Sequence, residues 1–141
     1  MWVSFLVNSV LVASAVLIHY EVLRQLSIII PKLSIRSRLK VLVSVFGTLC
    51  GHVVEIWLFG CAYYWLNSDP SFGSLLGNYD GSLMDSVYFS FSTYTSLGFG
   101  DIEPMGNIRF LAGLEALLGL VLITWSASFM YLEMTKYWRE K

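Results

Sequence analysis

The chain has 141 residues, of which 56% are hydrophobic and only 13% charged, and its formal net charge is −1. A soluble domain carries about 25% charged residues, so we do not expect a soluble globule, a disordered chain or a disulfide scaffold. The near-zero net charge offers no basic surface for nucleic-acid phosphates, which excludes nucleic acid as an expected partner.

Three apolar stretches are long enough to span a bilayer, which requires about 20 residues. The first begins at Trp2, reaches about Ile18, continues as an amphipathic extension to Ile30 and stops at Pro31. The second and third cover residues 41–66 and 108–132. A cleaved signal peptide is not favoured for the first stretch, because no Lys or Arg precedes it. The pattern predicts an all-α integral membrane protein with three transmembrane helices.

The placement of charge predicts the orientation in the membrane. Basic residues gather around the connection between the first two stretches and after the third: Arg24, Lys32, Arg36, Arg38, Lys40, Lys136, Arg139 and Lys141. Residues 67–107 contain acidic side chains and no Lys or Arg. The expected location is the cell (inner) membrane. By the positive-inside rule, the connection and the C-terminus are cytoplasmic, and the N-terminus and residues 67–107 lie on the outer side.

The outer segment contains a short apolar helix. Residues 67–81 are typical of an exposed turn region. Ser82, with Asp85 three positions later, marks a helix start. Residues 83–94 are apolar and aromatic, yet as a helix they extend only ~18 Å. They are too short to cross and too apolar for water, so we expect a re-entrant pore helix, which is tolerated where protein or a water-filled cavity surrounds it.

The sequence Thr-Ser-Leu-Gly-Phe-Gly-Asp follows this helix at residues 95–101. Alternating glycines permit backbone angles that let a strand turn successive carbonyls toward one side. A row of carbonyls that faces a common axis replaces the water around a cation. The partially negative C-terminal end of the short helix favours the same charge. The segment is therefore predicted to hold a dehydrated monovalent cation.

Residues 95–101 resemble the signature Thr-Val-Gly-Tyr-Gly-Asp of the potassium-channel pore-domain family. The aromatic half-helix, the filter-like segment, Pro104 and a following apolar helix appear in the family's order, so the resemblance covers roughly residues 40–135. The chain is similar to a small bacterial ion-channel protein built on two pore helices, with one extra N-terminal helix.

This resemblance implies an architecture and a function. The chain would divide into an N-terminal helix with its basic connection (1–38), a pore domain (39–135) and a short cytoplasmic tail (136–141). The pore domain would contain an outer helix (41–66), the pore helix (83–94), the filter (95–101) and an inner helix (108–132). A homotetramer in membrane lipid would conduct K⁺ passively, with no cofactor, no soluble ligand domain and no enzymatic activity.

The resemblance also implies roles for single residues. The ion-binding oxygens would come from the filter residues Thr95, Ser96, Leu97, Gly98, Phe99 and Gly100. Four of these would hold K⁺ itself: Ser96, Leu97, Gly98 and Phe99. Asp101 would sit behind the outer mouth and accept a hydrogen bond from Tyr88, which stands at the family's Trp position. Ser, Leu and Phe replace the family's Thr, Val and Tyr, so a weakly selective Na⁺/K⁺ channel and a non-conducting membrane subunit remain alternatives.

An enzymatic interpretation fits less well. The run from Gly98 to Asp101 also matches the Gly-x-Gly-Asp of presenilin-type intramembrane aspartyl proteases, and Tyr79 with Asp80 resembles their Tyr-Asp partner. A carboxylate dyad requires both aspartates in apolar helices, close enough to share a proton. Here Asp80 lies in a polar turn segment and Asp101 follows the filter.

The third apolar stretch contains a candidate hinge and a candidate cavity lining. Gly119 matches the family's hinge glycine if one residue is deleted after Pro104, and close helix packing is an equal alternative. One helical stripe after it would line the cavity if it faces the axis: Leu120, Ile123, Ala127 and Tyr131. A ring of Tyr131 or Phe129 side chains would gate by dewetting.

Three ionisable residues lie within apolar spans, where charge is costly: His52, Glu55 and Glu115. His52 and Glu55 share a helix face. A hydrogen-bonded packing network is favoured over a pH-sensitive brace behind the filter. A zinc site is least favoured, because no further His or Cys joins at metal-ligand spacing.

Two further patterns concern packing and the membrane interface. Gly47 and Gly51 form a Gly-x-x-x-Gly pair, which indicates close helix packing against the first apolar stretch. The run Tyr63-Tyr64-Trp65 is typical of an interfacial aromatic belt.

Overall fold

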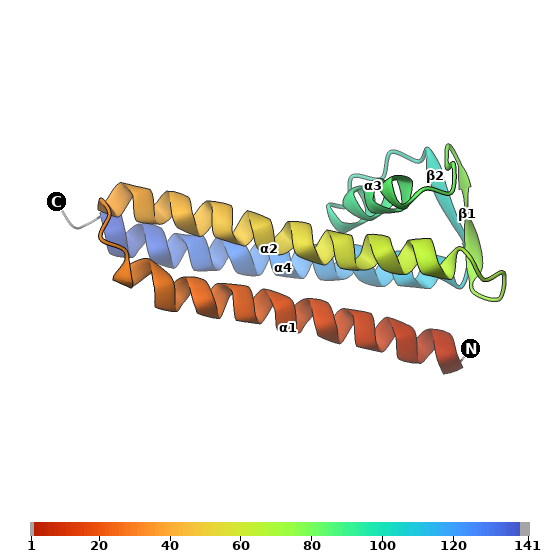
Figure 1. Cartoon of the computed structure of the whole chain (residues 1–141), viewed down its shortest axis with the longest axis horizontal. Coiled ribbons are helices and arrows are strands. Elements are labelled where there is room, and N and C mark those ends of the chain that lie inside the picture. The colour runs from red at the N-terminus through yellow and green to blue at the C-terminus, as the bar shows by residue number, and fades with distance from the viewer. Residues whose placement is uncertain (1, 139–141) are drawn as a thin grey trace.

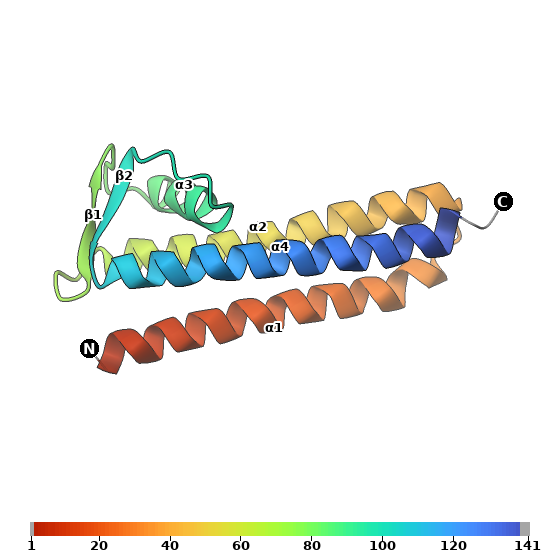
Figure 2. The same cartoon turned by 180° about the vertical axis from the view of Figure 1, so that it is seen from behind.

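The computed structural model describes residues 2–138, which form four helices and two strands. In chain order these are α1 (Trp2–Lys32), α2 (Ser37–Leu66), β1 (Gly73–Gly77), α3 (Leu83–Tyr94), β2 (Ile102–Gly106) and α4 (Ile108–Trp138). The three long helices α1, α2 and α4 lie side by side, and α3 and the two strands gather at one end of this bundle (Figures 1 and 2).

All three long helices are long and apolar enough to cross a membrane. They are longer than their apolar cores predicted, since α2 begins at Ser37 instead of 41 and α4 continues to Trp138 instead of 132. The ends of these helices contain polar residues that still favour a helix, so each helix continues beyond its apolar run. Similarly, α1 ends at Lys32, one residue beyond Pro31. Arg139 and Lys141, part of the expected cytoplasmic tail, lie outside the described residues.

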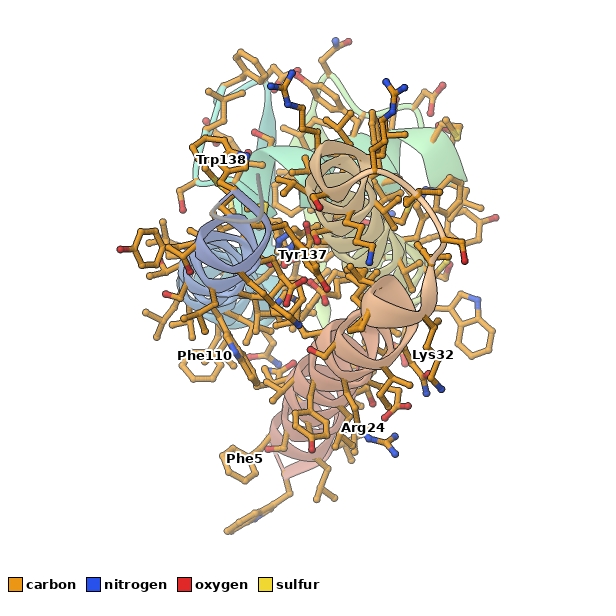
Figure 3. The ribbon with its side chains drawn as sticks, turned by 90° about the vertical axis from the view of Figure 1, so that its left-hand side faces the viewer. Phe5, Arg24, Lys32, Phe110, Tyr137 and Trp138 are labelled. Atoms are coloured by element: carbon orange, nitrogen blue, oxygen red, sulfur yellow. The ribbon has the colours of Figure 1, made fainter. Side chains whose placement is uncertain are left out.

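The two ends of the bundle differ in composition. The N-terminus lies at the end that carries α3 and the strands, and the connection from α1 to α2 lies at the other end with the C-terminal part of α4 (Figures 1 and 3). There, the Nζ atoms of Lys40 and Lys136 lie 5.1 Å and 5.0 Å from the centroid of the Tyr137 ring. The two basic segments of the sequence therefore share one end of the bundle.

Residues 67–81 are more regular than the exposed turn region that the sequence suggests. β1 pairs antiparallel with β2, in a register that runs from Gly73 opposite Gly106 to Gly77 opposite Ile102. Both terminal glycines of β1 have positive φ, and a Cβ at Gly77 would lie 2.3 Å from the Asp101 carbonyl oxygen. The sequence did not predict β1 for two reasons. Its segment is rich in turn-forming residues, and its partner β2 follows α3 in the sequence. The strand pair joins the segment before α3 to the segment after residues 95–101.

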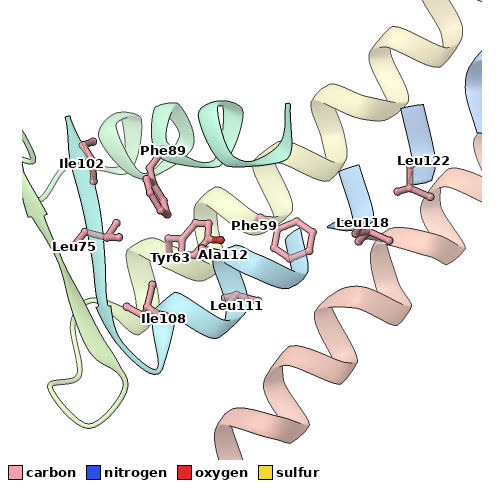
Figure 4. Close-up of a cluster of buried hydrophobic side chains, with 11 residues drawn as sticks. Phe59, Tyr63, Leu75, Phe89, Ile102, Ile108, Leu111, Ala112, Leu118 and Leu122 are labelled. Atoms are coloured by element: carbon pink, nitrogen blue, oxygen red, sulfur yellow. The ribbon is translucent and has the colours of Figure 1, made fainter. Parts of the chain in front are cut away.

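The largest apolar core lies where α2, α3, α4 and the strands meet (Figure 4). Phe59, Tyr63 and Leu111 are buried there, with Leu75 reaching in from β1. The rings of Tyr63 and Phe89 meet edge to face, with centroids 4.9 Å apart. This core fixes α3 against the two long helices α2 and α4.

The predicted packing of the Gly-x-x-x-Gly pair against the first helix is confirmed. A Cβ at Gly47 would lie 2.4 Å from Leu26 Cδ2, and one at Gly51 would lie 3.0 Å from Val22 Cγ1. Small residues in α2 thus allow α1 to approach its backbone.

Candidate functional site

The start of α3 is fixed by a local hydrogen-bond network. Ser82 Oγ accepts a hydrogen bond from the Asp85 amide at 3.1 Å, as their spacing predicts. The Asp80 amide donates to Asp85 Oδ2 at 2.9 Å, and the Ser82 amide donates to Asp80 Oδ1 at 2.7 Å. The hydrogen bonds from Ser82 hold the pKa of the exposed Asp80 carboxyl below its ordinary value, so this carboxyl stays ionised.

Glycines in the neighbouring helices hold α3 along its length. A Cβ at Gly60 of α2 would lie 2.8 Å from Val87 Cα, and a Cβ at Gly119 of α4 would lie 2.0 Å from the Tyr94 carbonyl oxygen. The backbone of α4 therefore touches the last residue of α3. This contact gives Gly119 a packing role, which was one of its two sequence-based interpretations.

The backbone of residues 97–99 turns its amide groups toward Ser92. The amides of Leu97 and Gly98 donate to the Ser92 carbonyl oxygen at 2.9 Å and 3.2 Å, and the Phe99 amide donates to Ser92 Oγ at 3.3 Å. In a trans peptide the carbonyl before each amide points the opposite way. The carbonyls of Ser96, Leu97 and Gly98 therefore point away from Ser92, all toward the same side.

Alternating backbone handedness makes this one-sided arrangement possible. Ser96, Gly98 and Gly100 have φ values of +57°, +56° and +78°, and Ser96 is the only non-glycine with positive φ among the described residues. Such a conformation costs a non-glycine residue about 1–3 kcal/mol. The prediction of a filter strand is thus wrong, because residues 95–101 form no regular β-strand. The alternation that aligns the carbonyls also prevents strand pairing.

The end of the segment next to Asp101 is held from two directions. Tyr88 Oη donates a hydrogen bond to Asp101 Oδ2 at 2.9 Å, the pair that the family resemblance implies. The Tyr88 ring stacks on the Phe99 ring, with centroids 6.3 Å apart and planes 5° from parallel. The Asp101 carbonyl accepts from the Asn78 amide at 2.8 Å, next to β1.

The face that carries these carbonyls is uncovered in the single chain. Every residue from 95 to 100 is exposed, and the side chains of Leu97 and Phe99 are 61% and 64% exposed. A hollow of about 460 Å³ lies between the segment, α3 and α4, and its lining includes Ser92, Ser96, Gly98, Pro104, Ala112 and Ala116. The predicted cavity stripe on α4 is also exposed: Leu120, Ile123, Ala127 and Tyr131.

The buried ionisable residues separate into two networks. Glu115 accepts a hydrogen bond from Tyr63 Oη and another from Ser90 Oγ, both at 2.5 Å. Ser90 Oγ also contacts the Ile56 carbonyl at 2.8 Å. Placing Tyr63 in an interfacial belt is therefore wrong, since its side chain is buried and its hydroxyl faces Glu115. This network joins α2, α3 and α4 and does not include His52.

The second network includes a residue that sequence reasoning missed. His19 of α1 places Nδ1 2.9 Å from Glu55 Oε1. His52 Nδ1 lies 2.8 Å from Tyr94 Oη, which itself donates to Glu55. Ser126 Oγ lies 2.9 Å from His52 Nε2 and 3.3 Å from His19 Nε2. The available signal was the polarity of a histidine in an apolar span, although nothing in the sequence names its partner.

The two aspartates of the protease alternative lie in different surroundings. Asp80 lies in the segment before α3, where its carboxylate accepts from the Ser82 amide, whereas the Asp101 carboxylate accepts from Tyr88. Neither lies in a long apolar helix.

Comparisons with known proteins identify the family of the chain. The family described as "Ion channel" matches residues 39–136. A curated relative, "Protein LctB" of Geobacillus stearothermophilus, is 38% identical over 91 residues, which cover 64% of this chain and 67% of that protein. No solved structure matches the chain. The chain is a membrane protein that belongs to the two-helix ion-channel domain family, the family of the potassium-channel pore.

Proposed function

We propose that the chain assembles as a four-fold symmetric homotetramer and passes K⁺ passively across the membrane. The observation that carries this proposal is the arrangement around Ser92, where three consecutive amides turn inward and leave three carbonyls on the opposite, exposed side. Carbonyl oxygens in such a row replace the hydration shell of a monovalent cation. Movement down an electrochemical gradient requires no cofactor and no catalytic group.

The exposure of residues 95–100 supports assembly around an axis. One chain supplies carbonyls from one side only, and a dehydrated cation requires oxygens all around it. Symmetric copies provide these oxygens and cover the apolar face of α4 at the same time. Residues 95–101 of each copy would then form one quarter of the filter.

The proposed orientation places α3 as a re-entrant helix on the outer side. The N-terminus lies at the same end of the bundle, and the basic connection from α1 to α2 lies at the other end with the C-terminus (Figure 1). By the positive-inside rule the basic end is cytoplasmic. Carboxylates at the outer end, such as Asp80, Asp101 and Glu103, then raise the local concentration of cations.

A weakly selective Na⁺/K⁺ channel is a second candidate, and Phe99 is the residue that favours it. Phe99 has no hydroxyl to brace the filter, and its ring stacks on Tyr88 instead. The Tyr88–Asp101 hydrogen bond supplies a brace at the same height, which favours strict selection of K⁺. Reversal potentials under opposed K⁺ and Na⁺ gradients separate the two candidates.

K⁺ flux from liposomes that contain the purified full-length protein tests the proposal. Gly100→Asp places a side chain and a charge in the filter, so we expect flux to fall to the level of empty liposomes. Gly81→Asp is the matched control, because Gly81 is also a positive-φ glycine with open space around its Cβ position, but it lies before α3. We expect this control to conduct like the wild type.

Two outcomes would overturn the proposal. One is equal flux from Gly100→Asp and wild type. The other is a folded wild-type tetramer without K⁺ flux, which would favour a non-conducting membrane subunit. The mass of the purified assembly, measured in detergent by light scattering, reports whether four chains of 16.0 kDa associate.

A further inference from the structure

All four helices meet at a polar cluster that ion conduction through the filter does not use. His19 comes from α1, His52 and Glu55 come from α2, Tyr94 ends α3, and Ser126 lies on α4. One ligand atom from each of His19, His52 and Glu55 lies within 4.8 Å of the other two. His19 and Glu55 are fully buried, so this ion-pairing group is surrounded by protein.

When both imidazole rings are neutral, the hydrogen-bond directions leave this cluster short of one donor and one positive charge, which a proton on one ring or a bound cation supplies. The Glu55 carboxylate accepts from Tyr94 Oη and faces Nδ1 of both histidines. Glu55 is ionised, and the Tyr94 hydroxyl proton points to its carboxylate. Both Nδ1 atoms must then carry protons of their own. In neutral imidazole rings, both Nε2 atoms are therefore acceptors. Both Nε2 atoms contact Ser126 Oγ, which has one proton to donate. One ring nitrogen then lacks a donor, and the buried carboxylate lacks a full counter-charge.

A cation between the two Nδ1 atoms and the carboxylate removes both defects. It replaces the Nδ1 protons, so each ring carries its proton on Nε2. Both Nε2–H groups then donate to Ser126 Oγ, whose two lone pairs accept them. The charge of Glu55 is balanced at the same time.

The donor set and the spacing fit a divalent transition metal. Two imidazoles and one carboxylate form a known zinc ligand set, and ligands bound at about 2.0 Å in a tetrahedron lie about 3.3 Å apart. His52 Nδ1 lies 3.3 Å from Glu55 Oε2, and His19 Nδ1 lies 2.9 Å from Glu55 Oε1.

We propose that His19, His52 and Glu55 form a binding site for a divalent transition-metal ion of the zinc type. The sequence alone argued against zinc because no further His or Cys joins His52 and Glu55 at metal-ligand spacing, and the fold supplies His19 from α1. The His52 side chain is 14% exposed in the single chain, so the group is not completely enclosed.

Ser126 and Tyr94 form the outer shell of this site. Ser126 accepts from the ring nitrogens that face away from the metal, and Tyr94 holds the orientation of the Glu55 carboxylate. Such partners orient metal ligands, and their removal weakens binding. Because Tyr94 directly precedes the filter, a bound ion ties α1 to the base of the filter.

Zinc binding by the purified full-length protein, measured in competition with a chromophoric chelator, tests the site. We expect about one Zn²⁺ per chain for the wild type, with loss of binding in His19→Gln, His52→Gln and Glu55→Gln. Ser126→Ala is expected to weaken binding by about 10–100-fold. Glu115→Gln is the matched control, because Glu115 is an equally buried carboxyl in the other network, and we expect it to bind like the wild type.

X-ray absorption of the zinc-loaded wild type tests the ligands without a variant. Two imidazoles and oxygen, with no sulfur, are expected in the first shell. A wild type that binds no more zinc than His19→Gln would overturn the proposal, as would a zinc spectrum with sulfur ligands from Cys50 or Cys61. These readouts do not involve ion flux, so they stand or fall separately from the proposed channel function.

Discussion

Ser92 sets the direction of the candidate filter through two of its atoms. Its carbonyl accepts two amides and its hydroxyl accepts a third, so the backbone of the next residues can turn only one way. The Ser92 side chain is buried, which shields these bonds from water. A small polar residue in the last turn of α3 thus determines where oxygen atoms face several residues later.

At the outer end of the filter, we predict that Tyr88→Phe lowers the selectivity for K⁺ over Na⁺. The substitution removes the hydroxyl that donates to Asp101 at 2.9 Å and keeps the ring that stacks on Phe99. Without that bond Asp101 loses its link to α3, so the filter widens more easily, and we expect the permeability ratio from reversal potentials to fall several-fold.

Tyr64→Phe is the control for this prediction. Tyr64 is as exposed as Tyr88, at 39%, and it lies in α2. A permeability ratio that stays at the wild-type value in Tyr88→Phe, or that falls equally in Tyr64→Phe, would contradict the role assigned to this hydrogen bond.

The contacts of single residues were predictable where both partners belong to one motif. Tyr88 and Asp101 lie in one continuous motif, and they are in contact. His19 was missed because its partner Glu55 lies in another helix, and neither periodicity nor spacing reports such a contact. The prediction for Tyr63 was wrong because consecutive helical residues point about 100° apart. Three adjacent aromatic side chains therefore cannot all point away from the protein.

Among the elements, α3 is positioned by backbone contact at two points along one of its faces. Gly60 of α2 faces the Val87 backbone, and Gly119 of α4 faces the Tyr94 carbonyl. Because backbone atoms cannot rotate away as a side chain can, these two positions leave no room for a Cβ. The short helix is therefore held rigidly where the filter begins.

We predict that Gly119→Ala destabilises the protein and reduces K⁺ flux. The new Cβ would lie 2.0 Å from the Tyr94 carbonyl oxygen, so α3 and α4 must separate. Overpacking of this kind costs about 1–3 kcal/mol. Thermal unfolding in detergent should show a lower transition temperature than that of the wild type.

Gly113→Ala provides the matched control in the same helix. Its Cβ meets no atom within 4 Å, and alanine favours a helix over glycine by about 0.5–1 kcal/mol, so stability should hold or rise. Equal transition temperatures for the two variants would show that the α3–α4 contact is not rigid.

The existence of the elements was easier to predict than their ends or their pairing. Apolar runs identified the long helices, while polar residues such as Ser37 and Lys136 extend them without any hydrophobic signal. The β1–β2 pair escaped prediction because its strands are short and lie on opposite sides of α3 in the sequence. Non-local pairing leaves no periodic trace in either strand.

For the whole molecule, the sequence predicted the number of spans but the single chain does not fix the number of copies. An apolar surface residue looks the same whether it faces lipid or a neighbouring subunit. The proposal that several copies assemble thus rests on what residues 95–100 require, namely oxygens on every side of an ion, and the number four comes from the family resemblance. In the proposed tetramer, the exposed stripe of α4 would determine the width of the pore in its proposed cytoplasmic half.

This stripe leads to a prediction about the cytoplasmic mouth. Tyr131 is 66% exposed and lies on the same helical face as Leu120, Ile123 and Ala127. If four such rings meet near the axis, they form an apolar constriction that resists wetting. Tyr131→Ala should then widen the mouth and raise K⁺ flux in liposomes, where a tenfold rise corresponds to a barrier lowered by about 1.4 kcal/mol.

Leu132→Ala is the control, since Leu132 is 64% exposed but points about 100° away around the helix. Unchanged flux in Tyr131→Ala, or an equal rise in Leu132→Ala, would place the constriction elsewhere along α4.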